Sequence, residues 1–208
     1  MPSQPLQTEA FVLARRPAAE SFHAFSLFSP EHGNLLALQR APRMPGPGHV
    51  ALDLFDEVSL HLESSNQGRT WFVREARIVA RLAGIARSYE ALQAASAFAA
   101  LIALNPVETE SRGNVAELLR TVFDALAGTG SPAVTYFKSL YRFAREEGYP
   151  VRQQWLPSLP EPLRSQAELL LRTPLAALDA HAAPAAACAN LQRRLETYLR
   201  ENTEILLE

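Results

Sequence analysis

A chain of 208 residues is long enough for one large domain or two small ones, each with its own core. Hydrophobic residues make up 48% and charged residues 20%, which is typical of a folded globular protein and excludes a wholly disordered chain. The net charge of −2 gives no whole-chain support for binding a polyanion, so that function requires cations gathered on one face. A single cysteine, Cys188, excludes an internal disulfide and a cysteine-rich zinc site.

The N-terminal residues 1–7 are polar and contain prolines, unlike a secretory signal peptide. The longest apolar stretch, residues 91–104, is interrupted by Gln93 and Ser96 and is too short to span a bilayer. We therefore expect a protein that stays in a reducing cytoplasm and has no membrane partner.

The first third of the chain alternates between apolar and polar residues, as half-buried strands do. The predicted strands are residues 8–16, 21–29, 33–39, 50–63 and 68–76. A change of phase at residues 55–57 predicts a bulge or bend in the fourth strand. Short turns separate most of these segments, and one proline- and glycine-rich loop, residues 40–49, separates the third from the fourth. Five such strands favour a small closed barrel.

After residue 76 the apolar period changes to that of helices. The predicted helices are residues 75–85, 89–104, 115–127, 132–148, 162–171 and 185–206. A proline-rich tether, residues 150–162, carries Trp155, which we expect to cover the helical core. The sequence therefore predicts an α+β protein, with a barrel domain over residues 1–76 and an all-helical domain over residues 77–208.

Several segments resemble, in the right order, motifs of the RecO family of bacterial recombination mediators. Residues 8–16 (TEAFVLARR) are similar to the opening strand of that family, and residues 27–33 (LFSPEHG) to its first hairpin. Residues 39–43 (QRAPR) resemble its basic segment, and residues 71–76 (WFVREA) its last barrel strand. Residues 137–149 (FKSLYRFAREEGY) resemble its helical-domain signature.

The resemblance implies an OB-fold barrel followed by a helical domain, in a cytoplasmic, nucleoid-associated DNA-repair protein. Such a protein binds single- and double-stranded DNA. It promotes strand annealing or recombinase loading with a RecR-like protein and the C-terminal tail of single-strand-binding protein. None of this requires a cofactor. The family often carries a four-cysteine zinc site after its helical signature, but residues 150–162 hold no cysteine, so we expect no metal.

The candidate DNA-binding residues lie in the barrel segment, because phosphates need facing cations and unpaired bases need a surface to stack on. The barrel segment carries six arginines against eight carboxylates. Trp71 and Phe72 are adjacent on one strand and point to opposite faces, so one of them is a candidate stacking platform. The predicted DNA-binding residues are Arg15, Arg16, Arg40, Arg43, Arg69, Arg74 and Trp71.

A second group of cations, Lys138, Arg142 and Arg145, is predicted to be exposed on a helix and to border a groove for an acidic, apolar peptide tail. The balanced charge leaves open an alternative function from another class. In this alternative the chain is a protein-interaction adaptor on a RecO-like fold, with little intrinsic affinity for DNA.

The sequence gives little support for an enzyme. Four histidines lie in the barrel half, but no two have the spacing of a metal pair on a helix. Cys188 lies on an apolar helix face, which predicts a buried, inert thiol. The paired carboxylates Glu108/Glu110 and Glu146/Glu147 are interpreted as surface charge. We therefore expect no catalytic residues.

Overall fold

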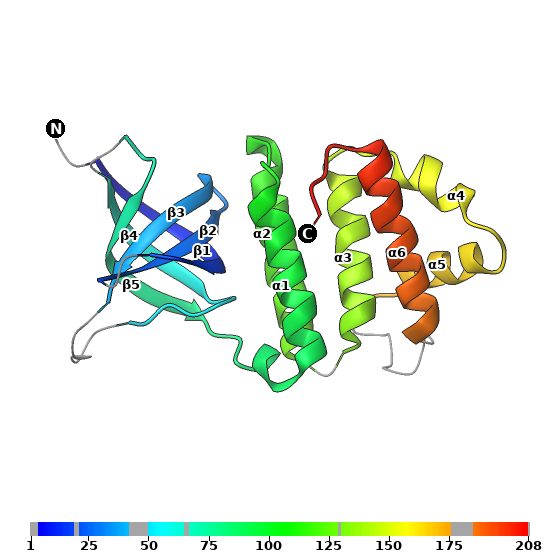
Figure 1. Cartoon of the computed structure of the whole chain (residues 1–208), viewed down its shortest axis with the longest axis horizontal. Coiled ribbons are helices and arrows are strands. Elements are labelled where there is room, and N and C mark those ends of the chain that lie inside the picture. The colour runs from blue at the N-terminus through cyan, green and yellow to red at the C-terminus, as the bar shows by residue number, and fades with distance from the viewer. Residues whose placement is uncertain are drawn as a thin grey trace. The chain divides into compact units, whose positions relative to one another are not determined.

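The computed structural model of the chain describes residues 4–18, 21–41, 50–64, 67–128, 130–175 and 185–207. Within these residues the fold is α+β, with five strands first and the helices after them (Figure 1). This confirms the predicted order of the two kinds of structure. The chain divides into two compact units, which we call the barrel unit (Met1–Leu82 with Pro106–Ala116) and the helical unit (Ala83–Asn105 with Glu117–Glu208).

The barrel unit is built on one sheet whose strands are β1 (Gln4–Arg16), β2 (Phe22–Ser29), β3 (Gly33–Arg40), β4 (Glu57–Ser64) and β5 (Trp71–Ala80). Their order is β1-β2-β3-β5-β4, and β4 pairs with β1, so the sheet closes on itself as a barrel. The pair β3–β5 is parallel and short, joining Ala37 to Trp71 and Leu38 to Phe72. The other pairs are antiparallel.

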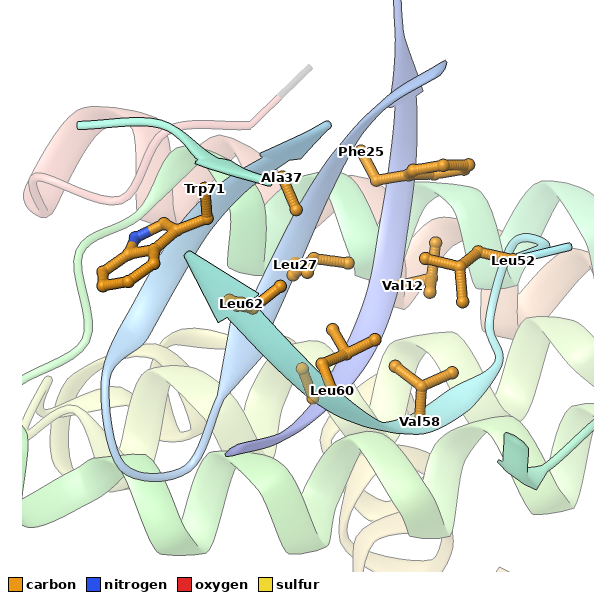
Figure 2. Packing of buried hydrophobic residues seen from close by; sticks show 10 residues of the cluster. Val12, Phe25, Leu27, Ala37, Leu52, Val58, Leu60, Leu62 and Trp71 are labelled. Atoms are coloured by element: carbon orange, nitrogen blue, oxygen red, sulfur yellow. The ribbon is translucent and has the colours of Figure 1, made fainter. Parts of the chain in front are cut away.

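Alternation along β3 and β4 buries one face of the sheet, as expected for period-two sequences, whereas parts of β1 and β2 are buried on both faces. The buried cluster consists of Ala10, Val12, Phe25, Leu27, Ala37, Leu52, Val58, Leu60, Leu62 and Trp71. Figure 2 shows these side chains converging from the different strands, with the Trp71 indole at one side of the cluster. The inner face is therefore filled by side chains, and any binding surface of the sheet lies on its outer face.

One helix prediction is wrong, and one strand prediction is wrong in part. The predicted helix over residues 75–85 does not form, because residues 71–80 continue as β5 and pair with β4. The predicted fourth strand, residues 50–63, forms only from Glu57 onward. The predicted bend is present just before it, where Phe55 takes a positive φ of 67°.

The longer α-helices of the described residues are α1 (Tyr89–Leu104), α2 (Arg112–Ala127), α3 (Pro132–Glu146), α5 (Leu163–Arg172) and α6 (Ala185–Asn202). The first turn of α2 belongs to the barrel unit. The Ser88 hydroxyl caps α1 by accepting a hydrogen bond from the backbone N–H of Ala91, and Pro132 opens α3. Among the described residues, no helix is long and apolar enough to cross a membrane.

The predicted proline-rich tether is more ordered than expected. It contains a π-helical turn, η3 (Val151–Trp155), and a short helical turn, α4 (Leu156–Ser158). As predicted, Trp155 covers the helical core: it is 2% exposed and packs against Phe137 and Tyr141 of α3. Cys188 of α6 is also buried as predicted, and burial raises the pKa of its thiol to about 11.

Candidate nucleic-acid interface

A row of paired residues defines the outer face of the closed sheet. Arg16 of β1 pairs with Ala24 of β2, Ala24 with Leu38 of β3, and Leu38 with Phe72 of β5. Directly paired residues share a face, and their chain neighbours point to the opposite face. The neighbours Phe25, Ala37 and Trp71 are core residues, so this row lies on the outside.

Two phenylalanines contact each other on this outer face. Phe22 of β2 belongs to the next row, where it pairs with Arg40 of β3. Its ring and that of Phe72 lie edge to face, with centroids 5.9 Å apart and planes at 68°. Both side chains are half-buried, and Leu36 on the same face is 40% exposed. The outer face therefore offers apolar and aromatic surface to a ligand.

Cations border this apolar surface. The segments of β2 and β3 contain no Asp or Glu, and Arg40 at the end of β3 is exposed. No carboxylate among the described residues pairs with Arg40. Arg16 is exposed on β1, two strands away, and its Nε donates to the Ser26 hydroxyl at 2.9 Å. We call the surface formed by Arg16, Phe22, Leu36, Leu38, Arg40 and Phe72 the outer β2–β3 face.

Arg74 is weaker as a phosphate ligand than the sequence indicated. It follows Phe72 along β5, but its guanidinium bonds Glu63 of β4, with Nη2 2.7 Å and Nε 2.8 Å from Oε2. This exposed pair neutralises the cation locally, although such pairs contribute little to stability. To bind a phosphate, Arg74 therefore has to give up its ion pair with the Glu63 carboxylate.

Two further predicted barrel residues, Arg15 and Arg69, are not on the outer β2–β3 face. Arg15 pairs with the core residue Phe25, so it lies on the other side of β1 from Arg16, and its Nη2 donates to His23 Nδ1 at 2.7 Å. Arg69 is exposed in the connection between β4 and β5. Arg43 lies outside the described residues.

Trp71 is not a stacking platform in this structure. Its side chain is 6% exposed and belongs to the sheet core (Figure 2). The prediction that Trp71 and Phe72 point to opposite faces is confirmed, but Phe72 is the one on the outside. The signal for Phe22 was present in the sequence as well, because it occupies the alternate phase of the strand that contains Phe25 and Leu27.

A set of polar contacts fixes the segment that leads into β4. The buried side chain of Gln39 accepts a hydrogen bond from the N–H of Leu52 and donates one to the carbonyl of Val50 at 2.7 Å. Arg81 binds the carboxylate of Asp56 with two nitrogens, at 2.7 and 3.0 Å, and that carboxylate is 1% exposed. These contacts hold the end of β3, which carries Arg40, against its neighbours.

The helical unit contains a separate groove of about 1850 Å³, lined mainly by α2, α3, η3 and α5. The predicted partner-binding residues Lys138, Arg142 and Arg145 all line it. The expectation that Lys138 is exposed is wrong: its ammonium donates to the carbonyls of Leu170 and Thr173 at the C-terminal end of α5. Burial there lowers the pKa of Lys138.

A metal site needs several ligating side chains close together. The described residues contain no cluster of three or more His, Cys, Asp or Glu side chains that could hold a metal ion. The chain matches no protein-family model and no curated protein. The structure itself shows an α+β protein whose sheet has an outer face with arginine and aromatic side chains.

Proposed function

We propose that the closed sheet is an OB-type barrel and that its outer β2–β3 face binds single-stranded nucleic acid. One observation carries this proposal. An exposed leucine, Leu36, and a half-buried phenylalanine, Phe22, lie on two strands that have no carboxylate, and Arg16 and Arg40 border them. The five-stranded order with one parallel pair supports the OB assignment, since OB-folds bind oligonucleotides on the face of strands 2 and 3.

The distribution of charge accounts for binding by a chain whose net charge is −2. Several carboxylates of the barrel unit lie elsewhere or are already paired: Glu9 is on the β1–β4 side, Asp56 binds Arg81, and Glu63 binds Arg74. A phosphate at the outer β2–β3 face therefore meets cations before it meets acids. Bases would contact Phe22 and Phe72, because stacking needs a ring but no particular sequence.

The resemblance to RecO, together with this face, supports a role in DNA repair or recombination. The chain would bind DNA and promote strand annealing or recombinase loading with partner proteins. A RecR-like protein and the acidic tail of single-strand-binding protein remain predicted partners. Double-stranded DNA and association with the nucleoid likewise remain predictions from the resemblance.

Charge reversal at the two border arginines tests the proposed face. The Arg16→Glu/Arg40→Glu variant should lose about 100-fold in affinity for an oligothymidylate at low salt, since each lost charged hydrogen bond is worth roughly 1.5 kcal/mol. The slope of log K against log salt should flatten by about 1.4, or about 0.7 per lost phosphate contact. Fluorescence anisotropy of a labelled oligonucleotide measures both quantities.

The matched control is Arg77→Glu/Arg87→Glu, which makes the same change in charge at two exposed arginines outside the face. Its affinity should stay within a few-fold of the wild-type value. Equal losses in both double variants would mean that only the overall charge matters, and the face would be wrongly assigned. If the wild-type protein binds no DNA even at low salt, the adaptor function would replace the proposed one.

A further inference from the structure

The groove in the helical unit has an excess of cations. Its lining contains the cations Lys138, Arg142, Arg145, Arg152, Arg164 and Arg172, against the carboxylates Asp124, Glu161 and Glu168. The cations come from different elements, since three are on α3, one is in η3 and two are on α5. Four of them already have partners: Lys138 donates to backbone carbonyls, and Arg142, Arg164 and Arg172 pair with Glu146, Glu161 and Glu168. The cations that remain available to a ligand are therefore mainly Arg145 and Arg152.

Tyr141 of α3 lines this groove as well. The Tyr141 side chain is 6% exposed and lines the groove, and its hydroxyl has no hydrogen-bond partner among the described residues. Burial raises the pKa of this phenol, and the charges of Arg145 and Arg152 oppose that change. Tyr141, Arg145 and Arg152 all line the same groove, and Tyr141 and Arg145 are four residues apart on one face of α3.

The two arginines retain free donors. Arg145 is paired only loosely, with 3.7 Å between its Nη2 and Oε1 of Glu146, and that oxygen lies 2.7 Å from Nε of Arg142. Arg152 is exposed, and no carboxylate among the described residues pairs with it. A hydroxyl and two guanidinium groups together provide the donors that a phosphate oxygen cluster accepts.

We propose that this groove is a second nucleic-acid site, in which Tyr141, Arg145 and Arg152 hold a backbone phosphate of a single strand. The site goes beyond the outer β2–β3 face and does not depend on it. A chain with both sites holds two strands at once. Holding two strands raises their effective concentration for each other, which is what annealing requires.

The arrangement of the groove favours a nucleic-acid strand over an acidic peptide. Arg142 follows Lys138 by four residues and Arg145 by seven, so the cations of α3 form a row about 10 Å long. Arg164 and Arg172 of α5 also line the groove, but they pair with Glu161 and Glu168 and would have to exchange these carboxylates for a phosphate. A nucleic-acid strand has one charge on every nucleotide, so its phosphates can contact cations along the whole row. A peptide with acids at one end would use only part of it.

The groove is tested in a protein whose barrel face is disabled. In the Arg16→Glu/Arg40→Glu background, binding of oligothymidylate should persist at low salt. Adding Arg145→Glu/Arg152→Glu should reduce this residual affinity at least tenfold, and adding Tyr141→Phe should reduce it about threefold. With the barrel face intact, Arg145→Glu/Arg152→Glu should lower the number of strands bound per chain from two to one, as measured by sedimentation velocity.

The control is Arg193→Glu/Arg194→Glu, an equal change of charge on exposed α6 residues outside the groove, which should leave the strand count at two. Two strands bound to the Arg145→Glu/Arg152→Glu variant would overturn the proposal. It would also be overturned if this variant lost only an acidic peptide and kept its second strand. Because the barrel substitutions are measured separately, failure of the β2–β3 face cannot be mistaken for failure of the groove.

Discussion

Replacing Trp155 by alanine is expected to destabilise the helical unit by about 3–5 kcal/mol, the usual cost of truncating a buried tryptophan. Trp155 is 2% exposed, and its ring centroid lies 6.1 Å from that of Phe137 and 5.9 Å from that of Tyr141. Removing the indole leaves a cavity beside both rings. Urea unfolding followed by far-UV circular dichroism, to which the helices contribute most, measures the loss.

The conservative variant Trp155→Phe separates packing from hydrogen bonding. The indole N–H of Trp155 has no hydrogen-bond partner among the described residues, so phenylalanine gives up ring area but no hydrogen bond. We expect a loss of about 1 kcal/mol for this variant. A loss below about 1 kcal/mol for Trp155→Ala would show that Trp155 does not close the helical core.

Replacing Arg81 by alanine is expected to cost the barrel unit about 3 kcal/mol of stability. The Asp56 carboxylate is 1% exposed, and its remaining donor is the backbone N–H of Asp53 at 2.9 Å. Removing the guanidinium leaves a buried charge without its counter-ion, which costs more than the intact pair contributes. The same substitution also removes the 2.7 Å hydrogen bond from Arg81 to the carbonyl of Ala51.

Arg77→Ala is the matched control, because Arg77 is exposed on β5, which ends just before Arg81, and pairs there with Ser59. Its effect should stay within about 0.5 kcal/mol. The double variant Asp56→Ala/Arg81→Ala should lose less than the sum of the single variants, since it buries no unpaired charge. Thermal unfolding monitored by Trp71 fluorescence in the Trp155→Phe background reports on the barrel unit. Equal effects of Arg81→Ala and Arg77→Ala would contradict the assigned role of the Asp56 pair.

Much of the fold could be predicted from local patterns. Alternation located β2 and β3 almost to the residue, and Ser131-Pro132 marked the start of α3. The segment after Trp71 was assigned to the wrong structure beyond residue 76, because its charged and alanine residues also suit a helix. These residues form a strand up to Ala80 because they pair with β4. That pairing is made with another segment of the chain, so a local pattern does not reveal it.

The candidate site was predicted in outline and corrected in detail. Arg16 was selected from its position at the end of a strand and Arg40 from the loop after the third strand, and the structure brings them to neighbouring rows of one face. Burial of Trp71 and the pairing of Arg74 with Glu63 depend on sheet register, which composition does not specify. Tyr141 and Arg152 were missed because they gather only when α3 and η3 pack together.

Photo-crosslinking tests the central claim, that the outer β2–β3 face binds single-stranded nucleic acid, most directly. The wild-type protein is irradiated with a bromouracil-containing oligonucleotide, and the crosslinked peptides are identified by mass spectrometry. We predict crosslinks at Phe22 and Phe72, reduced in the Arg16→Glu/Arg40→Glu variant and unchanged in the Arg77→Glu/Arg87→Glu variant. Crosslinks confined to peptides of the helical unit, with none in β2, β3 or β5, would contradict the account.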